Sequence, residues 1–574
     1  MIKFTANSTV NKLLNKIALD IKKFINHSCS DKCDSEKLVE SVINDIGECI
    51  EKQEKHINTL NEIGMALSSE NNLDKLLEMI LSEAKKFTNT DGGTLYLVSK
   101  DEEFLNFKVV ITDSLNIKMG GTEGEIKWPA LKLHKEDGSQ NREMVAALSA
   151  LEKRIIDIPD VYEADGFNFE GTKRFDASTG YRSQSMLVIP MLNYEKEVIG
   201  VLQLINKKDT VSGKTIAFNI DDELSTMSLA SQAAVAITNT QLVLDLQNLL
   251  ESVVKSIAVA VDEKSPYTGG HVRRVAALAM LVAKAISETS SGRYKDITYD
   301  NDQLREIYMS AWMHDVGKVT TPEHIVDKST KLSTIYDRIH NIATKFEVAK
   351  RDAEINYLKS IASGIDERKK IELKKYFLNS IKQLDNDFEF LKTVNIGGEF
   401  MSDDKIERVK RISQIKLIQN GVVSYLLNED EVKNLCIKKG TLTEDERQKI
   451  NDHAIVSFKM LSALPFPKKL SKIPEIAGAH HEKLNGKGYP RGLTAEQISL
   501  EGRIMALADI FEALTAADRP YKPAKTLNEC KKIIDFMIKD GELDGDLVEF
   551  FYDNGLDMEY AKKELKPEQY KSDI

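Results

Sequence analysis

The sequence predicts a multidomain protein, with an α/β domain in the first half and an all-α domain, interrupted by a helical insertion, in the second. Two observations lead to this prediction. Short strand-like runs alternate with helical runs before residue 221, whereas the second half is helical in its apolar spacing. The 574 residues are enough for two globular domains with helical additions.

The expected domain limits follow these changes in pattern. They are 1–55 for an N-terminal helical segment, 56–221 for the α/β domain, 222–264 for a long connecting helix, 265–545 for the all-α domain and 546–574 for a C-terminal tail. Residues 331–440 form an insertion rich in Lys and Glu, with apolar residues at helical spacing. We expect a helical hairpin or bundle with a solvated charged face there; a partner surface or a cap over a neighbouring site is the alternative.

The α/β domain is predicted from one helix and a series of strands. Residues 73–100 have the pattern of an amphipathic helix, a turn and a strand, and further strands are expected at 104–111, 185–192 and 198–207. This pattern resembles a GAF domain, a compact sensory module.

Five residues at the end of this domain extend the resemblance. Asn206, Lys207, Phe218, Asp222 and Glu223 reproduce the NKFDE pattern of GAF domains of the cyclic-nucleotide-binding type. We expect Lys207 and Asp222 to pair and to lock the last strand onto the following helix, so the motif indicates the fold more strongly than a ligand. The resemblance implies a cyclic nucleotide as a candidate ligand; another small molecule, or dimerisation alone, is the alternative.

The connecting helix runs from Asp222 to about Lys264 without Gly or Pro. Its apolar residues recur at three- and four-residue steps, at Leu242, Leu246, Leu249, Val253 and Ile257. We name these five residues the seam. Such a seam favours a parallel homodimer. A helix packed on its own domain is the alternative.

The second half contains a series of metal-ligand side chains. In order, they are His271, His314, Asp315, His453, His480, His481 and Asp509. Imidazole and carboxylate suit a divalent transition metal, and seven such groups exceed the needs of one ion. They therefore favour a two-metal centre of the kind that acts on phosphate esters. Because five of the ten histidines occupy these positions, ordinary core or surface histidines are a poor explanation.

Three motifs connect these residues to a known family. His314 to Lys318 spells HDVGK, residues 480–493 spell HHEKLNGKGYPRGL, and residues 503–522 spell RIMALADIFEALTAADRPYK. The series resembles the HD superfamily of phosphohydrolases, and within it the HD-GYP family. The resemblance implies hydrolysis of cyclic di-GMP to linear pGpG and/or GMP. Another cyclic dinucleotide, such as cyclic GMP-AMP, or a catalytically silent receptor is the alternative.

The resemblance also implies how the ligands divide between two ions, with iron or manganese as the expected metals. Asp315 would bridge the ions. One ion would be completed by His271, His314 and Asp509, and the other by His453, His480 and His481.

Lys318 is the expected catalytic partner of Asp315. It lies three residues after Asp315 and four after His314, so we expect all three on one face of a helix. Its ammonium group can neutralise a phosphate oxygen or protonate the leaving ribose oxygen.

Candidate substrate contacts follow in two segments. Gly488, Tyr489 and Pro490 have the composition of a tight loop. By resemblance this loop flanks the active site and can contact a diguanylate cyclase partner. Arg519 and Lys522 are candidate contacts to phosphate or guanine, because a guanidinium group binds phosphate through two hydrogen bonds.

Two residues depart from the family pattern. Tyr267 stands where many members have a Glu that helps to hold a third metal, and a phenol with a pKa near 10 is a poor substitute. We therefore expect two metals. Asn485 stands where the family has Asp, which removes a charge from the loop without removing a ligand.

Composition excludes several classes of partner. The net charge of −11 argues against a nucleic acid duplex, which needs a basic surface. The chain has no run of 18 apolar residues and no signal-peptide core, so we expect a cytoplasmic protein without membrane contact. Its five cysteines do not form a disulfide framework.

Overall fold

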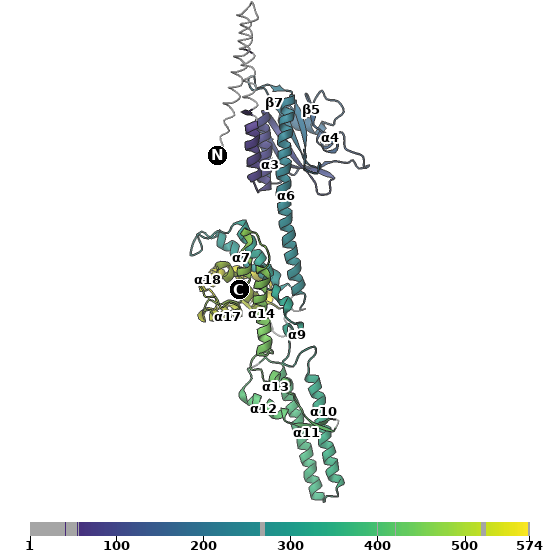
Figure 1. The fold of residues 1–574 in the computed structure, drawn as a ribbon, viewed down its shortest axis with the longest axis vertical. Helices are drawn as coiled ribbons and strands as arrows, with labels where there is room; N and C mark the ends of the chain where they lie inside the picture. The colour runs from purple at the N-terminus through teal and green to yellow at the C-terminus, as the bar shows by residue number, and fades with distance from the viewer. Residues whose placement is uncertain are drawn as a thin grey trace, which may run out of the picture. The chain divides into compact units, whose positions relative to one another are not determined.

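The computed structural model describes residues 41, 54–55, 57–264, 270–398, 400–419, 421–517 and 524–571 (Figure 1). The chain divides into two compact units, Met1–Asn248 and Leu249–Ile574. Nearly all of the expected N-terminal segment 1–55 lies outside the described residues, as do Tyr267, Arg519 and Lys522. Among the described residues, no helix combines the length and the apolar character that crossing a membrane requires.

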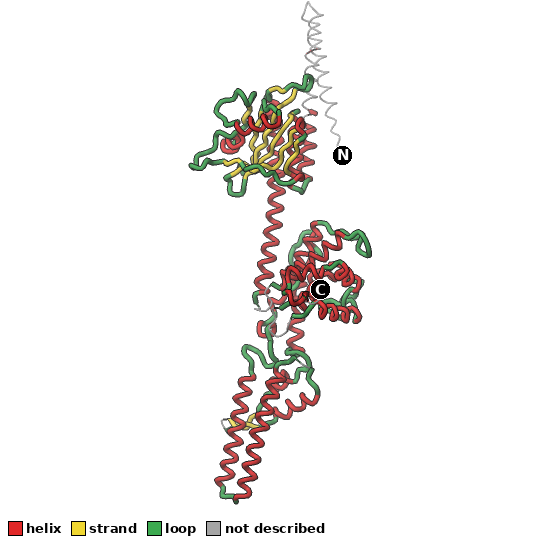
Figure 2. The backbone as a smooth tube through the Cα atoms, turned by 180° about the vertical axis from the view of Figure 1, so that it is seen from behind, coloured by secondary structure: helices red, strands yellow, loops and turns green. Residues whose placement is uncertain are grey.

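The first unit is built on one antiparallel sheet of eight strands, which confirms the α/β prediction (Figure 2). Its order is β3-β2-β1-β7-β6-β5, with β4 paired to β2 and β8 paired to β7. The strands are β1 Thr90–Val98, β2 Phe104–Thr112, β3 Ile117–Gly120, β4 Leu131–Lys132, β5 Ile156–Ile158, β6 Met186–Leu192, β7 Val198–Lys208 and β8 Thr215–Ile216. Short 3-10 helices, η1 Asp113–Leu115 and η2 Gly121–Glu123, follow β2 and β3.

Helices cover both faces of this sheet, because alternate strand residues point to opposite sides. One face packs against α3 (Leu73–Thr88) and the first part of α6 (Ile220–Asp262), with Leu95 buried between them. The other face, with Tyr96, packs against α4 (Val145–Glu152), and α5 (Glu170–Thr179) follows in the chain. The first core includes α6 residues up to Ile237, so the α/β domain extends beyond the limit expected at 221.

Most helices of the second unit form a bundle around one apolar core. Its main helices are α7 His271–Glu288, α8 Asn301–Met313, α14 Glu444–Ser462, α15 Ile473–Ala477, α16 Leu500–Thr515, α17 Leu527–Lys539, α18 Gly545–Asp553 and α19 Leu556–Glu564. Shorter pieces are η3 Val316–Thr320, α9 Glu323–Val326, η4 Lys468–Leu470 and η5 Pro567–Gln569. Capping boxes start several helices; in α14, Thr443 and Glu446 each bond to the other's backbone N–H.

The residues expected to be a C-terminal tail are instead part of this bundle. Leu547 and Phe551 of α18 and Tyr560 of α19 are buried in the same core as α7 and α16. Their apolar side chains recur at helical spacing, and this gives both helices a face to bury.

The insertion folds around a core of its own. Helices α10 (Ile339–Ala362) and α11 (Glu367–Asn395) form the expected hairpin, followed by α12 (Asp403–Ser413) and α13 (Glu429–Leu435). The fourteen residues of the insertion core all fall between Leu332 and Leu435. A two-stranded hairpin, β9 (Lys416–Gln419) and β10 (Val422–Tyr425), was not predicted. The Asn-Gly dipeptide at 420–421 is the sequence signal that indicates it.

Buried lysines join this insertion to the helical bundle. Lys328 Nζ lies 2.7 Å from Asn434 Oδ1 of α13 and 2.8 Å from Glu446 of α14. Lys331 Nζ donates to the carbonyls of Leu435 and Ile437 at 3.1 and 2.7 Å. Lys328 therefore joins α13 to the start of α14, and Lys331 joins the two ends of the insertion.

Candidate metal centre and ligand cavity

Five separate segments of the second unit bring the seven predicted ligand side chains together. His271 is the first residue of α7, and His314 and Asp315 lie between α8 and η3. His453 lies on α14, His480 and His481 follow α15, and Asp509 lies on α16. All are buried except His481, which is partly exposed.

Asp315 stands between two groups of histidines. Its Oδ2 lies 3.4 Å from His271 Nε2 and 3.3 Å from His314 Nε2. Its Oδ1 lies 3.2 Å from His453 Nε2 and 3.9 Å from His480 Nε2. The two oxygens of one carboxylate thus face different groups.

Each group has the composition of a metal site. His271, His314 and Asp315 form one set of ligand atoms within 4.8 Å of one another, and His453, His480 and His481 form the other. Asp509 Oδ1 lies 3.3 Å from His271 Nε2, which puts Asp509 beside the first group. In position, these side chains form the two sets that the family resemblance assigns to separate ions; the assignment of the ions stays a prediction.

Backbone carbonyls orient three of the imidazole rings. Nδ1 of His314 lies 2.7 Å from the carbonyl of Ala311, and Nδ1 of His480 lies 2.6 Å from that of Ala477. His453 makes the same bond to Ile450. Each of these carbonyls lies three residues before its histidine. Nδ1 therefore donates to a backbone carbonyl of the preceding turn, and the lone pair of Nε2 points to the candidate metal centre.

The donors fit divalent cations. His314 Nε2 and Asp315 Oδ1 are buried, and neither has a hydrogen-bond partner among the described residues. Buried polar atoms of this kind are costly unless a partner satisfies them. A cation in each group would supply that partner, and nitrogen and oxygen donors of this type suit iron, manganese and zinc.

The first group concentrates charge. Burial alone would raise the pKa of Asp315, but Lys318 and His314 hold that pKa well below its usual range. Burial likewise lowers the pKa of His271, yet its hydrogen bonds with Asp315 and Asp509 outweigh burial and raise the pKa well above its usual value. Ionised carboxylates therefore remain in a buried site, ready to hold positive charge.

Two imidazoles of the second group, those of His480 and His481, are neutral. Burial, followed by the nearby His481 and His314, lowers the pKa of His480 well below its usual value. Burial also lowers the pKa of His481 to about 4. Both imidazoles are therefore unprotonated near pH 7, which is the form that binds metal.

Lys318 lies against Asp315, although the local helix differs from the prediction. Its Nζ lies 2.6 Å from Asp315 Oδ2, and its side chain is 29% exposed. The single α-helical face expected for residues 314–318 was wrong, because α8 ends at Met313 and η3 is a 3-10 helix. Three residues per turn in a 3-10 helix still place residues 315 and 318 on one side.

Sequence reasoning missed two residues that support His271. Glu512, 1% exposed, bonds to His271 Nδ1 through Oε2 and accepts from Arg274 Nε at 2.7 Å through Oε1. It lies three residues after Asp509 on α16, so both carboxylates share one helix face. That spacing is the signal that could have found Glu512.

The loop that contains Gly488, Tyr489 and Pro490 lies beside the second group. The Tyr489 ring lies 4.8 Å from the His481 ring, centroid to centroid. A Cβ on Gly488 would lie 2.3 Å from the backbone N of Lys483, so only glycine fits there. Glu482, buried, accepts from the backbone N–H of Arg491 at 2.7 Å, which closes the loop.

Asn485 uses both atoms of its amide in this loop. Its Nδ2 donates to the carbonyl of Asp540 at 2.8 Å, and its Oδ1 accepts from the N–H of Lys487 at 3.0 Å. A carboxylate could not make the first bond, so this departure from the family pattern serves the loop's geometry.

In the first unit, the NKFDE residues stabilise the end of the sheet. Lys207 and Asp222 form the expected ion pair, and Phe218 is buried in the core. Asn206 accepts from the N–H of Gln184 at 2.7 Å and donates to the carbonyl of Arg182 at 2.8 Å. Glu223 lies in the first turn of α6. None of the five is among the described residues that line the neighbouring cavity.

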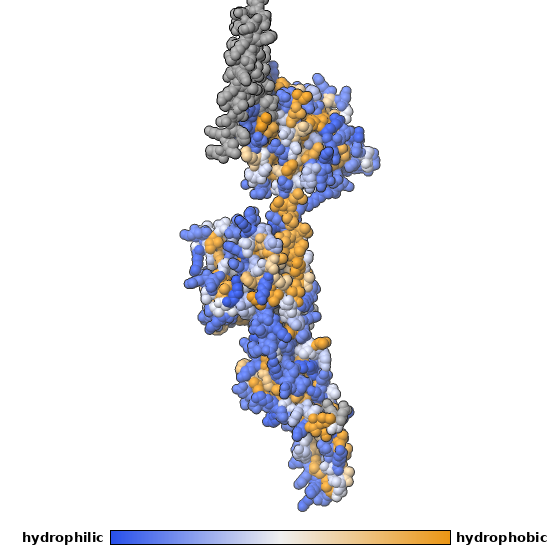
Figure 3. All heavy atoms as spheres, in the orientation of Figure 1, coloured by the Kyte–Doolittle hydropathy of each residue, from blue (hydrophilic) through white to orange (hydrophobic). Residues whose placement is uncertain are grey.

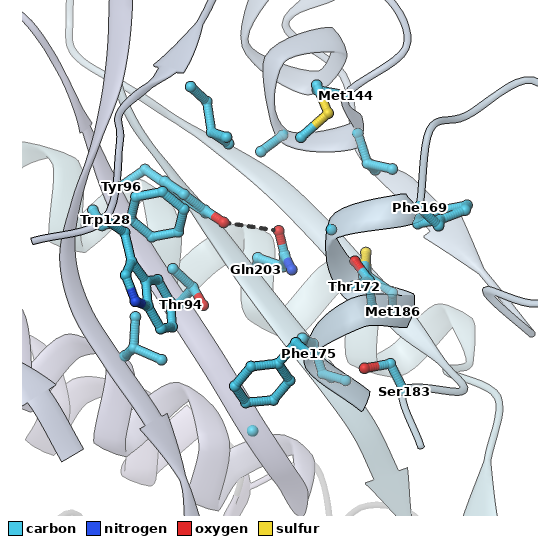
Figure 4. A pocket seen from close by; sticks show the side chains of 18 of the residues that line it. Thr94, Tyr96, Trp128, Met144, Phe169, Thr172, Phe175, Ser183, Met186 and Gln203 are labelled. Carbon is cyan, nitrogen blue, oxygen red and sulfur yellow. Dashed lines mark hydrogen bonds between the residues drawn. The ribbon is translucent and has the colours of Figure 1, made fainter. Parts of the chain in front are cut away.

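That cavity, of about 570 Å³, opens on the α4 side of the sheet (Figure 4). Five rings follow one another along it: Tyr96, Phe107, Trp128, Phe175 and Tyr181, with successive centroids 4.7 to 6.5 Å apart. We name them the aromatic wall. The volume falls within the range of small-molecule sites.

Polar side chains lie at several places along the cavity. Gln203 Oε1 lies 3.4 Å from the Tyr96 hydroxyl with Thr94 beside this pair, and Ser183 lies farther away, near Met186 (Figure 4). Of the described residues that line the cavity, Arg174 alone carries a charge. The lining thus combines flat apolar surfaces with a single cation.

Comparison with known families agrees with the α/β fold of the first unit and with the helical fold of the second. The GAF domain model matches residues 72–237, and two HD domain models match residues 268–385 and 429–547. The chain contains a GAF domain followed by an HD domain. The two HD matches are separated by residues 386–428, which belong to the insertion.

Curated relatives match parts of the chain. A 3′3′-cGAMP-specific phosphodiesterase 1 of Vibrio cholerae serotype O1 is 41% identical over 141 residues, covering 25% of this chain and 32% of that protein. The cyclic di-GMP phosphodiesterase response regulator RpfG of Xanthomonas campestris is 42% identical over 95 residues, 17% of this chain and 25% of that one. A cyclic di-GMP phosphodiesterase of Thermotoga maritima is 40% identical over 101 residues, 18% and 27% of the two chains. The chain therefore matches a third or less of the length of these relatives.

Glu512→Gln in the HD domain should weaken metal binding about ten- to hundredfold, because the partner that orients a metal-binding histidine contributes that much to affinity. Titration with Mn²⁺, followed by the electron paramagnetic resonance signal of the free ion, measures the effect. Glu501→Gln, in the first turn of the same helix, is the control and should bind as the unsubstituted chain does. Equal affinity in the two variants would show that Glu512 does not orient His271.

Proposed function

We propose that the HD domain hydrolyses a cyclic dinucleotide, cyclic di-GMP, to linear pGpG and/or GMP. The observation that carries the proposal is the position of Asp315, whose two carboxylate oxygens face two separate groups of buried ligand atoms. Centres of two metals suit the in-line displacement of a phosphate ester. The names of the relatives, which are phosphodiesterases for cyclic di-GMP or 3′3′-cGAMP, agree with this substrate class.

We assign two divalent ions, iron or manganese, to the seven proposed ligands. His271, His314 and Asp509 would hold one ion and His453, His480 and His481 the other, with Asp315 shared. When bound, the ions supply Lewis acidity toward a phosphate oxygen and the attacking water.

Lys318 has a proton to give in this reaction. Hydrolysis adds one water across a phosphorus–oxygen bond, so the leaving ribose oxygen must gain a proton. The Lys318 ammonium, held 2.6 Å from Asp315 Oδ2 and partly exposed, is the proposed donor and also balances charge on the phosphate.

Gly488, Tyr489 and Pro490 border the same site beside His481, and we assign them to substrate contact or to a diguanylate cyclase partner. Arg519 and Lys522 stay sequence predictions for phosphate or guanine contact.

The test is turnover of cyclic di-GMP by the full chain, purified without oxygen and loaded with ferrous iron or manganese. Asp315→Ala should abolish turnover and lower metal content, because it removes the shared ligand. Lys318→Met should lower kcat at least about a hundredfold at unchanged metal content, because it removes the proton donor. Lys284→Met, an exposed lysine on α7, is the matched control and should be unaffected.

Two outcomes would replace the proposal. Turnover of 3′3′-cyclic GMP-AMP without turnover of cyclic di-GMP would assign the alternative substrate. Binding of either dinucleotide without hydrolysis, by a chain shown to hold its metal, would make the HD domain a receptor.

We propose further that the GAF cavity binds a cyclic nucleotide that regulates the HD domain. The aromatic wall offers faces on which a purine can stack, and Gln203, Thr94 and Ser183 offer hydrogen bonds to its edge. Arg174 is the counter-charge for a phosphate, and the cavity lining described above contains no competing carboxylate.

Calorimetric titration of the full chain with cyclic GMP and cyclic AMP tests this assignment. Trp128→Ala should weaken binding of the preferred nucleotide about tenfold, because loss of one stacking surface costs about 1–3 kcal/mol. Arg154→Ala, on an exposed arginine outside the cavity, is the control. If neither nucleotide releases heat or shifts the melting temperature, the cavity takes a different ligand.

We also propose that α6 makes a parallel homodimer through the seam. The five seam residues of this helix are 43% to 67% exposed, and apolar side chains run along its surface (Figure 3). Burying such a stripe against a second copy is the usual solution for a long helix.

Light scattering during size-exclusion chromatography measures the oligomeric state. The chain should elute as a dimer, and Leu246→Glu with Leu249→Glu should convert it to a monomer, because two buried charges per chain would oppose the seam contact. Gln247→Glu introduces a charge on the same turn and should leave the dimer intact. A monomer before substitution would exclude this proposal.

A further inference from the structure

The last turn of α6 is built into the HD domain beside the metal centre. Ala258 is 3% exposed and packs in the HD core. A cavity of about 10 Å³ is lined by Asp262 of α6 together with Asp315 and Lys318, so these residues are close neighbours. The connecting helix therefore ends against the groups that the proposed reaction uses.

Just beyond α6, Lys264 contacts the backbone of the segment that carries Lys318. Its Nζ donates to the carbonyl of Thr321 at 2.6 Å, to that of Val319 at 2.9 Å and to that of Lys318 at 3.3 Å. These carbonyls lie at the C-terminal end of η3, where that of Lys318 also accepts from the N–H of Thr321 at 3.0 Å. An ammonium group is suited to this end, because partial negative charge collects there.

The start of η3 is held by α14. The N–H of Gly317 donates to Ser457 Oγ at 2.8 Å, and a Cβ at Gly317 would lie 2.1 Å from the carbonyl oxygen of His453. Side chain and backbone of α14 thus fix the start of η3, and Lys264 binds its end. Lys318 extends from this held segment to Asp315.

The same end of α6 also holds the start of α7. Asp262 Oδ2 accepts from the N–H of Gly270 at 3.0 Å. Gly270, with a φ of 88°, is the N-cap residue directly before His271. Two residues at the end of one helix therefore bind the backbone beside Lys318 and the backbone beside His271.

We propose that Lys264 is a positioning residue that sets the place of the Lys318 ammonium, and that α6 acts on turnover through this contact. The inference rests on the proposed phosphodiesterase function. Within the described part of the chain, Lys264 Nζ bonds to backbone carbonyls, so its loss changes where Lys318 lies without removing a metal ligand. A shift of the end of α6, caused by a ligand in the GAF cavity, would change kcat by the same route.

The experiment compares Lys264→Met, which keeps an apolar stem, with Lys264→Arg, which keeps a cation. Hydrogen exchange of the peptide 316–321 in the metal-loaded full chain reports the contact directly. Lys264→Met should speed that exchange and lower kcat for cyclic di-GMP about ten- to hundredfold, as small displacements of catalytic groups do. KM and metal content should stay within about twofold of the unsubstituted chain, since this contact binds neither substrate nor metal.

Lys264→Arg should restore both slow exchange and most of kcat. If Lys264→Met acted only by disturbing the structure in general, restoring the positive charge would not reverse its effects. Glu263→Gln, at an exposed neighbour, is the control and should change neither. Should Lys264→Met fail to fold, Lys264→Gln carries the same comparison.

Each outcome decides the inference. Unchanged exchange at 316–321, or faster exchange with unchanged kcat, overturns it. If the unsubstituted chain hydrolyses no cyclic dinucleotide, the proposed function fails; exchange that then differs between the Met and Arg variants still supports the positioning contact, and exchange that does not differ overturns it.

Discussion

The helical domain depends on one buried carboxylate. Asp315 is 4% exposed and lies within 4 Å of four histidines and Lys318, which come from α7, α8, η3, α14 and the residues after α15. A buried carboxylate stays charged only where positive groups surround it. The segments must therefore converge, and the apolar core beneath them, with residues from α7, α8, α15 and α16, keeps them there. Removal of the carboxylate would leave both groups of histidines without a shared partner.

The insertion shows how this centre tolerates additional chain. It enters after α9 and leaves before α14, yet its apolar residues pack with one another. Lys328 ties α13 to the start of α14, and Lys331 ties the two ends of the insertion to each other, in both cases through buried hydrogen bonds. A separate core with a fixed base places little demand on the surrounding helices, and lengthening a loop costs little entropy. His453, two turns into α14, keeps its position beside Asp315.

Residue types in fixed order identified the candidate ligands, because metal chemistry restricts which side chains can serve. Less of the surrounding geometry could be predicted. Glu512 has an ordinary sequence context, and its role arises only where α16 meets α7. The change from α-helix to 3-10 helix after Met313 depends on the tight contact of Gly317 with α14, a tertiary effect that local propensity does not contain. The ion pair of Lys207 with Asp222, by contrast, could be predicted from residue type, and it is why the NKFDE motif indicated the fold more strongly than a ligand.

Helix α6 contributes residues to two separate cores. Leu229 and Ala233 are buried in the GAF core, whereas Val254 and Ala258 are buried in the HD core. Between them lie Leu242, Leu246 and Leu249, which are more than half exposed and have no Gly or Pro nearby to break the helix. A helix anchored at both ends transmits a displacement only as far as its middle resists bending, and a second copy packed on that exposed stretch would supply the resistance. The proposed dimer and the proposed regulation would therefore depend on each other: without a partner helix, a ligand in the GAF cavity would bend the middle of α6 before it moved Asp262 and Lys264.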